Sequence, residues 1–371
     1  MTPTAEITVT RLLTRKNALG QSQIRRHAEP VLPAAGEALL RIERVALTTN
    51  NITYAAFGDA MQYWQFFPTG DDAFGHMPVW GFAEVLASDV SGLAVGERFY
   101  GYLPIASHLR VQPTRVTERG FYDAAPHRQS LTSAYNHYVR CSSDAAYEPQ
   151  FQDQQILLRP LFITSFMLAD FLQDNAFFGA TRLVVSSASS KTAYGTAFCL
   201  QDQPGIELVA LTSAGNRSFV DRLGCYARCV SYDELESLPA EVPTVYVDFS
   251  GDTALRARVH QHVGEALRHD CYAGSAQNTD FLSEADLPGP KPQFYFAPVQ
   301  IKKRNSDWGH AEVNRRFNAA QADFIRHVGS GAPPWLRVAE HAGFDAAAQL
   351  ITQLHAGRMA PDLGHVVVMP A

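Results

Sequence analysis

A run of small, mostly hydroxyl-bearing residues joins an apolar stretch to a candidate helix near the middle of the chain. The residues in question are Ser187, Ser189, Ser190, Lys191 and Thr192. In a βα unit such a turn lies at the carboxyl edge of the sheet, where open α/β folds bind ligands. Small side chains let backbone amides approach a phosphate, and a helix N-terminus favours negative charge. The segment therefore predicts a site for a nucleotide pyrophosphate.

The glycine-rich sequence usual in such loops is absent, since Gly195 is the first glycine after the apolar stretch. Serine can cap a helix and hydrogen-bond to phosphate, but it resists the positive φ that glycine adopts freely. The alternative is a purely structural strand-to-helix turn in a degenerate nucleotide domain.

The end of the second predicted strand bears on the choice of cofactor. NAD sites commonly carry an Asp or Glu there, which binds the ribose hydroxyl. In this chain the first carboxylate after that strand is Asp221, whereas Thr212, Ser213 and Arg217 suit a 2′-phosphate. Lys191 can reach that phosphate or the pyrophosphate. We therefore predict NADP(H), although Arg217 would also be ordinary as a solvated charge. The predicted site further includes Ser250 and Gly274.

A phosphoryl-transfer site is the rival interpretation of the same loop. Lys191 with its two neighbours, and Asp248 at the end of a later apolar stretch, resemble a Walker A and B pair. The loop lacks both glycines of the Walker A sequence, whose backbone amides cradle the phosphates. The pattern therefore disfavours phosphoryl transfer.

A second polar cluster lies early in the chain and holds the candidate catalytic residues. Tyr54 carries a phenol that can hydrogen-bond to a carbonyl oxygen or donate a proton to it, and Asn51 and Asn50 carry amides that can orient a substrate. Alternatively, the asparagines form a turn in which they cap backbone amides. The aromatic run at 61–67, with Trp80, offers an apolar wall for an aromatic or acyl substrate, or ordinary core.

The elements around the serine turn alternate between helix and strand. We predict helices at 161–178, 192–201, 216–223 and 254–268, and strands at 181–186, 207–212, 244–249 and 270–274. Apolar strands separated by helices are typical of a parallel sheet covered on both faces. Right-handed crossovers then favour an α/β, doubly wound sheet. Later, we expect an aromatic strand at 294–297, helices at 312–327 and 346–355, and a strand at 364–369.

The first 150 residues have a different rhythm, with short alternating runs at 38–45, 80–86 and 97–103 broken by Gly, Pro and Asp. This pattern is typical of an antiparallel, barrel-like domain. A length of 371 residues suits two domains, and 46% hydrophobic residues suffice for two cores.

Charge and cysteine content exclude several classes of function. A formal net charge of −6 argues against a nucleic-acid partner. Five cysteines, an odd number spread along the chain, favour free thiols in a reducing compartment. The first residues have no signal-peptide pattern, and no apolar run reaches the roughly 20 residues of a membrane helix. We therefore expect a cytoplasmic protein without a membrane partner.

The order of these segments resembles the medium-chain dehydrogenase/reductase superfamily, and within it the zinc-free, quinone-oxidoreductase-like branch, close to a poorly characterised bacterial offshoot of unknown function. The resemblance covers nearly the whole chain and rests on residues 45–50, 78–85, 92–99, 135–139 and 344–369. It implies a GroES-like β-barrel domain made of residues 1–150 and 335–371, and a Rossmann-type nucleotide domain at 151–334. It also implies a homodimer.

Two departures from the superfamily argue against a catalytic zinc. Zinc-dependent members carry Gly-His-Glu where this chain has Gly81, Phe82 and Ala83, and a cysteine where it has Asn50 and Asn51. These replacements leave too few ligands for the metal.

The resulting hypothesis is a zinc-independent, NADP(H)-dependent oxidoreductase. Its substrate is a small-molecule ketone, quinone or α,β-unsaturated carbonyl. The alternative is a degenerate member of the same fold that works without a cofactor, as a lyase, a retro-aldolase or a ligand-binding protein.

Overall fold

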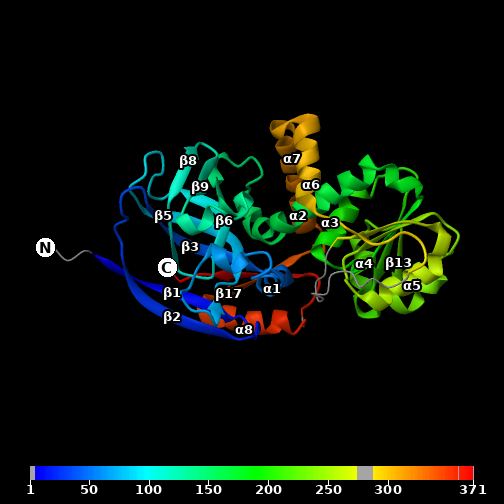
Figure 1. Cartoon of the computed structure of the whole chain (residues 1–371), viewed down its shortest axis with the longest axis horizontal. Coiled ribbons are helices and arrows are strands. Elements are labelled where there is room, and N and C mark those ends of the chain that lie inside the picture. The colour runs from blue at the N-terminus through cyan, green and yellow to red at the C-terminus, as the bar shows by residue number, and fades with distance from the viewer. Residues whose placement is uncertain (1–4, 274–286, 358, 371) are drawn as a thin grey trace. The chain divides into compact units, whose positions relative to one another are not determined.

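The computed structural model describes residues 5–273, 287–357 and 359–370 (Figure 1). The chain divides into unit 1, Met1–Leu157 with Arg337–Ala371, and unit 2, Leu158–Leu336. The domain boundaries predicted after residues 150 and 334 lie shortly before these two divisions. The first division falls inside helix α2 (Gln152–Asp174).

Unit 1 is built mainly of antiparallel strands. Its larger sheet has the order β17-β18-β3-β5-β6-β10-β9-β8, with β7 also paired to β3, and its smaller sheet has the order β2-β1-β4. Alternate residues of β3, among them Leu40 and Ile42, point into one core, and burial of each such side chain contributes about 1.5–3 kcal/mol. The strands are β1 (Glu6–Arg15), β2 (Ser22–Pro30), β3 (Ala38–Leu47), β4 (Phe74–Gly75), β5 (Pro78–Ser88), β6 (Arg98–Pro104), β7 (His108–Val111), β8 (Pro113–Thr117), β9 (Gly120–Asp123), β10 (His137–Arg140), β17 (Arg337–Ala342) and β18 (Leu363–Val368).

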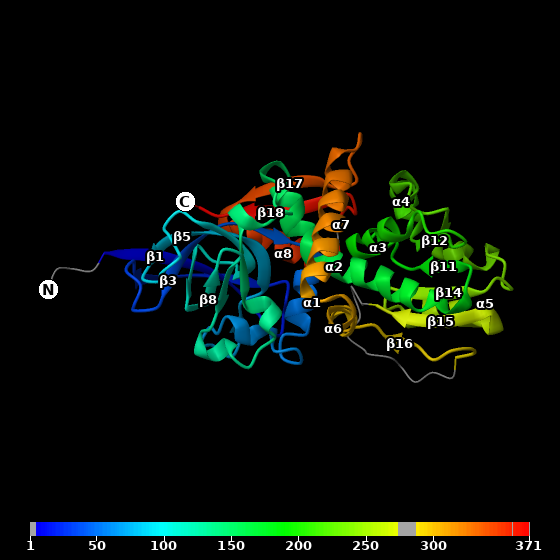
Figure 2. The ribbon, with the colours of Figure 1, turned by 90° about the horizontal axis from the view of Figure 1, so that it is seen from above.

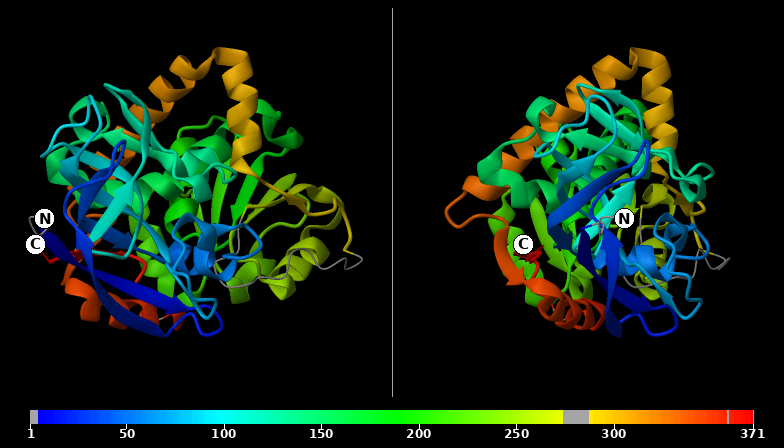
Figure 3. Two further views of the ribbon diagram at one scale, coloured as in Figure 1. Left: turned by 60° about the vertical axis from the view of Figure 1, so that its left-hand side comes forward. Right: turned by 90° about the vertical axis from the view of Figure 1, so that its left-hand side faces the viewer.

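The end of the chain completes unit 1. Strand β18 pairs antiparallel with β3, and β17 pairs parallel with β18. Between them, α8 (Gly343–His355) lies alongside β1 and β2 (Figures 1 and 3). Helix α8 buries Phe344, Leu350 and Ile351 in the same core that β3 lines. The strands and this helix thus share one core.

Unit 2 is a parallel sheet with the order β13-β12-β11-β14-β15-β16 (Figure 2). This order is that of a doubly wound nucleotide-binding fold, in which the first strand lies in the middle and the chain winds outward in both directions. The elements are β11 (Arg182–Val185), α3 (Lys191–Leu200), β12 (Glu207–Thr212), α4 (Arg217–Leu223), β13 (Arg228–Ser231), the 3-10 helix η8 (Tyr232–Ser237), β14 (Thr244–Asp248), α5 (Thr253–Val263), β15 (Leu267–Tyr272), β16 (Gln293–Phe294), α6 (Ala297–Trp308) and α7 (His310–Ser330).

Alternation along the strands of unit 2 assigns its helices to two faces of the sheet. Leu183 and Val185 pack in a cluster with residues of α2, α3 and α7. Val184, between them, packs instead with residues of α5 and η8. Because successive side chains of a strand point to opposite faces, the sheet is covered on both sides.

Helix α2 is the one helix of the described residues that is long and apolar enough to be compared with a membrane span, although no such run was expected from the sequence. The segment Pro149–Asp174 is long and apolar enough to cross a membrane by length and composition, and 56% of its most apolar stretch is buried inside the protein. Within unit 2, Phe162 of this helix stacks on Phe324 of α7 with ring centroids 4.5 Å apart. These contacts are those of a core helix.

Several predicted elements differ in extent. The helix predicted at 254–268 ends at Val263, because Gly264 takes a φ of 54° and β15 begins at Leu267. The strand predicted at 294–297 is only Gln293–Phe294, and α6 starts at Ala297 with a proline in its first turn. The helix predicted at 161–178 begins earlier and ends at Asp174. Strands β13 and β17 were not predicted.

Candidate functional site

The sheet of unit 2 reverses its direction of winding between β11 and β14. From β11 the chain proceeds through α3 to β12 and through α4 to β13, then crosses back to β14 on the other side of β11. Parallel strands bring their carboxyl ends to one edge, and ligands bind where the winding reverses. The loops after β11, β12 and β14 therefore form the candidate nucleotide edge.

The loop after β11 turns sharply without a glycine. Ser187 has a φ of 46°, in the left-handed region that glycine favours. The Ser190 hydroxyl caps α3 by accepting a hydrogen bond from the Ala193 amide at 3.3 Å. Asn216 Nδ2 donates to the Ser189 hydroxyl at 3.0 Å and so joins this loop to the one after β12. The serine turn thus forms a capped strand-to-helix junction.

Gly195 allows α3 to pack closely against α2. A Cβ at this position would lie 2.7 Å from the Ser165 hydroxyl, which is closer than real Cβ contacts allow. Ser165 in turn donates to the Thr192 carbonyl at 2.8 Å. Gly195 therefore makes room for Ser165, whose hydrogen bond holds the first turn of α3.

Most of the predicted nucleotide contacts are accessible at this edge. Arg217 and Ser213 are exposed, and the half-buried residues are Ser187, Ser189, Ser190, Lys191, Thr192 and Ser250. The exception is Thr212, whose side chain is 1% exposed at the end of β12, so it can position the loop but not present its hydroxyl. Gly274 lies outside the described residues.

The loop after β14 is held by a buried carboxylate. Asp248 Oδ1 accepts hydrogen bonds from the Ser186 hydroxyl at 2.8 Å and from the Ser250 amide and hydroxyl at 2.8 and 2.7 Å. Its other oxygen pairs with Arg256 at 2.5 Å. Asp248 is fully buried, and its carboxylate binds protein groups. The phosphoryl-transfer alternative would instead require this carboxylate to bind a metal ion.

Arg256 belongs to a buried cluster of charged groups. It also lies 3.5 Å from Asp270 of β15, whose carboxylate contacts His260 Nε2 at 2.7 Å. Asp248, Asp270 and His260 are all fully buried, and Arg256 is 4% exposed. Sequence patterns did not single out this cluster, although the spacing of Arg256 and His260 places both on one face of α5.

Arg217, the predicted 2′-phosphate contact, has an acidic partner. Its Nη1 lies 2.8 Å from Glu234 Oε2 of η8. Glu234 also accepts hydrogen bonds from the Ser231 hydroxyl and amide, at 2.8 and 3.3 Å, and these bonds lower its pKa. A second residue of η8, Tyr232, accepts a hydrogen bond from the Ser187 amide at 3.2 Å. Neither residue was predicted, because β13 before them was missed.

In unit 1, the predicted catalytic tyrosine lies in a cluster of aromatic rings. Tyr54, on α1 (Thr49–Ala56), is 7% exposed. Its ring centroid lies 4.8 Å from Tyr63, 5.6 Å from Tyr102 and 6.2 Å from Tyr135. Trp80 Nε1 donates to its hydroxyl at 3.3 Å. The structure therefore joins segments that are far apart in the sequence around one phenol.

Burial keeps the Tyr54 phenol protonated. Desolvation raises the pKa of Tyr54 to about 12, and its hydrogen bonds to Trp80, Asn50 and Tyr135 offset only part of that rise. The Tyr63 and Tyr135 hydroxyls lie 3.4 Å apart. Tyr54 is thus a neutral hydrogen-bond donor with Asn50 within reach of its hydroxyl.

Asn51 and Asn50 are in different environments. The Asn51 amide oxygen accepts from the Thr48 amide at 2.7 Å and its nitrogen donates to the Pro78 carbonyl at 2.9 Å. Asn51 therefore holds α1 in the capping arrangement weighed against a substrate role. Asn50 is half-buried, and its side chain takes no part in that capping arrangement.

The aromatic run at 61–67 contributes mainly to the core. Trp64, Phe66 and Phe67 are each less than 10% exposed, and Met61 is 48% exposed. Trp80 and Tyr63 are partly buried and pack on the Tyr54 cluster. Trp80 and Tyr63 therefore remain as candidates for a substrate wall beside Tyr54.

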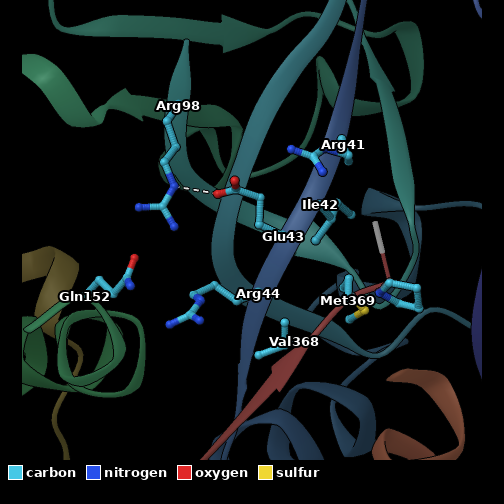
Figure 4. Close-up of a pocket in the computed structure, with 9 residues that line it drawn as sticks. Arg41, Ile42, Glu43, Arg44, Arg98, Gln152, Val368 and Met369 are labelled. Atoms are coloured by element: carbon cyan, nitrogen blue, oxygen red, sulfur yellow. Dashed lines mark hydrogen bonds and ion pairs between the residues drawn. The ribbon is translucent and has the colours of Figure 1, made fainter. Parts of the chain in front are cut away.

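A pocket of about 280 Å³ lies in unit 1 beside β3, β6 and β18 (Figure 4). Three arginines line it, but each has an acidic partner: Arg98 pairs with Glu43 at 2.5 Å, Arg44 with Asp153 at 2.5 Å and Arg41 with Glu84 at 2.7 Å. The pocket is therefore balanced in charge and is not suited to an anion.

At the positions of the superfamily's zinc ligands, Gly81, Phe82 and Ala83 form part of β5, and Phe82 is fully buried. Among the described residues, no three His, Cys, Asp or Glu side chains gather closely enough to hold a metal ion.

Residues 45–360 match a family described as protein of unknown function, DUF2855. The chain belongs to this family. No curated protein matches the sequence. Membership in DUF2855 therefore gives a family without an assigned activity.

Solved structures similar to this DUF2855 chain share its fold. CurA from Vibrio vulnificus in complex with NADPH is 15% identical, with a TM-score of 0.62, over 99% of this chain and 100% of its own. The yhdH oxidoreductase from Salmonella enterica in complex with NADP is 14% identical, with a TM-score of 0.54, over 98% and 100%. CurK enoyl reductase is 13% identical, with a TM-score of 0.52, over 98% and 99%. This chain therefore has the fold of these reductases, an α/β fold with a GroES-like domain of antiparallel strands and a Rossmann-type doubly wound domain, as predicted.

Proposed function

We propose that the protein is an NADPH-dependent oxidoreductase that reduces a carbonyl compound without zinc. The observation that carries the proposal is the loop after β11, which presents a capped helix N-terminus at the reversal point of a doubly wound sheet. Proteins of the same fold named in complexes with NADPH and NADP support it.

The residues of this edge fit a dinucleotide. The first amides of α3 and the Lys191 ammonium suit a pyrophosphate, because both bring positive charge to the first turn of this helix. Ser213 and Arg217 are exposed at the end of β12, where a 2′-phosphate binds in this fold. Thr212 and Ser250 position the loops, since one is buried and the hydroxyl of the other is bound to Asp248.

When bound, NADPH supplies the hydride. In unit 1, Tyr54 hydrogen-bonds the substrate carbonyl oxygen and gives it a proton, because burial holds its pKa near 12 and keeps the phenol protonated. Asn50 orients the same oxygen, while Asn51 holds α1 in place. The substrate class is a ketone, a quinone or an α,β-unsaturated carbonyl carrying an aromatic or acyl group, which Trp80 and Tyr63 would face.

We further propose a soluble, cytoplasmic homodimer. Phe294, in β16, and Phe296 are 51% and 46% exposed, and their rings stack 6.2 Å apart at the last strand of the unit 2 sheet among the described residues. Paired aromatic side chains beside an open strand are suited to contact with a second copy. Analytical ultracentrifugation tests this: the wild type is expected to sediment as a dimer and Phe294→Ser with Phe296→Ser as a monomer, and a monomeric wild type would refute the dimer.

The reaction is tested by following NADPH absorbance with a panel of enones, quinones and ketones. Turnover with at least one class is expected, with the product identified by mass spectrometry. Tyr122→Phe, which changes a barrel tyrosine of β9 outside the Tyr54 cluster, serves as the matched control for Tyr54→Phe. Absence of NADPH consumption across all three classes would contradict the proposed substrate class.

One observation favours a second candidate, a cofactor-independent protein of the same fold. The Ser187 amide and the Arg217 guanidinium, both predicted for the nucleotide, are already bonded to Tyr232 and Glu234. On this alternative the Tyr54 cluster would perform lyase or retro-aldol chemistry, or would only bind a ligand. Product formation from the same panel with no nucleotide present would favour it.

A further inference from the structure

The segment after β13 reaches two of the groups proposed to bind the nucleotide. Tyr232 and Glu234 both lie on η8, which begins directly at the end of β13. Tyr232 contacts the loop after β11, and Glu234 contacts the first residue of α4, after β12. A single short segment thus contacts both the loop after β11 and the start of α4.

Glu234 supplies a carboxylate that the sequence lacks after the second strand. In sites for NAD, an acidic residue usually stands at the end of that strand. Here the strand β12 is followed by Ser213 and Arg217, and the carboxylate comes instead from η8, 2.8 Å from the Arg217 guanidinium. The pair is neutral as a unit, so Arg217 does not offer a net positive charge to a 2′-phosphate while Glu234 is bound to it.

The Glu234 carboxylate is held in place by a residue of its own segment. The Ser231 hydroxyl and amide both donate to its carboxylate, forming the capping box of η8. A carboxylate held by three donors keeps its charge, and the bonds to Ser231 lower the pKa of Glu234. The pair with Arg217 is nevertheless exposed, with both side chains about half accessible, so an incoming phosphate can compete for the guanidinium.

Tyr232 forms a hydrogen bond with a second group of the nucleotide edge. Its hydroxyl accepts the hydrogen bond of the Ser187 amide, in the turn where Ser187 has a positive φ. This contact is independent of charge, so its effect must be the same for NADPH and NADH.

We propose that η8 restrains nucleotide binding, with Glu234 setting the preference between NADPH and NADH and Tyr232 affecting both equally. This inference rests on the proposed function. The 2′-phosphate must displace Glu234 from Arg217, so Glu234 weakens NADPH binding relative to NADH. The segment is therefore a specificity determinant placed outside the usual second-strand position.

The test compares Glu234→Gln with Glu236→Gln by calorimetric titration with NADPH and with NADH. The glutamine introduced by Glu234→Gln keeps an amide oxygen that accepts from Ser231, so the cap of η8 is retained. Glu236, on the same segment, pairs with Arg258 of α5 at 2.8 Å and is the matched control. Glu234→Gln is expected to strengthen NADPH binding about 3- to 10-fold and to leave NADH within about 2-fold, and the gain should shrink as salt is raised. Glu236→Gln should change neither.

Tyr232→Phe is the second variant to be titrated. We expect it to strengthen the binding of NADPH and of NADH equally. If the wild type binds NADPH and Glu234→Gln leaves the ratio of the two affinities unchanged or lowers it, the inference is wrong and the proposed function stands. If neither the wild type nor any of these variants binds either nucleotide, the proposed function itself fails, and the inference with it.

Discussion

At the nucleotide edge of unit 2, the candidate contacts are mostly half-buried or exposed groups on short loops, whereas in unit 1 the candidate proton donor is almost completely buried among aromatic rings. The edge depends on backbone amides and exposed charges that a ligand can redirect. The aromatic cluster depends on desolvation, which holds one phenol in a single protonation state. Substitutions should therefore affect binding in the first region and chemistry in the second.

Buried charged residues nevertheless hold the loops of the nucleotide edge in place. Asp248 and Arg256 connect the loops after β11 and β14 to α5 and β15. Buried hydrogen bonds and ion pairs thus hold the loops that carry the exposed candidate contacts. Substitution within this buried cluster should therefore have the largest effect on stability.

Replacing Arg256 with Met should destabilise unit 2 by about 3–5 kcal/mol, because it leaves Asp248 and Asp270 buried without their cation. Urea unfolding followed by circular dichroism measures the loss. The matched control is Arg258→Met on the same helix, whose pair with Glu236 is exposed and should cost less than about 1 kcal/mol. Equal losses of stability in the two variants would show that the buried cluster does not support the loops of the nucleotide edge.

Tyr54→Phe should lower kcat by about 100-fold, because it removes the proton donor and the bond to the carbonyl oxygen. NADPH affinity, measured by titration, should stay unchanged because Tyr54 lies in the other unit. Tyr122→Phe should keep wild-type turnover. A Tyr54→Phe enzyme with full kcat would remove the phenol from the mechanism.

High pH should weaken the protein through the same tyrosine. Because the pKa of Tyr54 is raised from 10.0 to about 12 by burial, the folded state holds the proton more tightly than the unfolded state. The stabilisation is fully present below pH 10 and is lost between pH 10 and pH 12, by about 2–3 kcal/mol. The free energy of unfolding of Tyr54→Phe should therefore fall less than that of the wild type between pH 8 and pH 12. Identical losses would contradict the assigned burial effect.

Ser190→Ala should have the smallest effect, about 1 kcal/mol in stability, since one capping bond of α3 is lost. It should also weaken NADPH binding by a few-fold, because the α3 N-terminus frays where the pyrophosphate binds. Ser218→Ala, an exposed residue in the first turn of α4 that is not the N-cap residue, is the comparison. A fully retained NADPH affinity would place the pyrophosphate elsewhere.

The βα alternation of unit 2 could be predicted because its strands are continuous apolar runs with well-marked helices between them. Strand β13 was missed because it is only four residues long and carries Arg228 and Ser231. The helix α6 was missed because its sequence is mostly polar, with no long apolar periodicity. These gaps are local and leave the sheet order intact.

The candidate sites were predicted unevenly for a physical reason. Strand ends gave the positions of Ser190, Lys191 and Arg217, because parallel strands share one carboxyl edge. The partners Tyr232 and Glu234 depend on how the chain turns after an unpredicted strand. In unit 1, the contacts of Tyr54 with Trp80, Tyr102 and Tyr135 depend on long-range antiparallel pairing, which residue type and spacing do not specify.

The most direct test of the account is an isothermal titration of the purified protein with NADPH, in the wild type and in Lys191→Ala. The account predicts binding in the micromolar range that weakens markedly in Lys191→Ala. It also predicts that binding is retained in Lys302→Ala, an exposed lysine of α6. No detectable heat for the wild type at millimolar NADPH would contradict the central claim and leave the Tyr54 cluster to be explained without a cofactor.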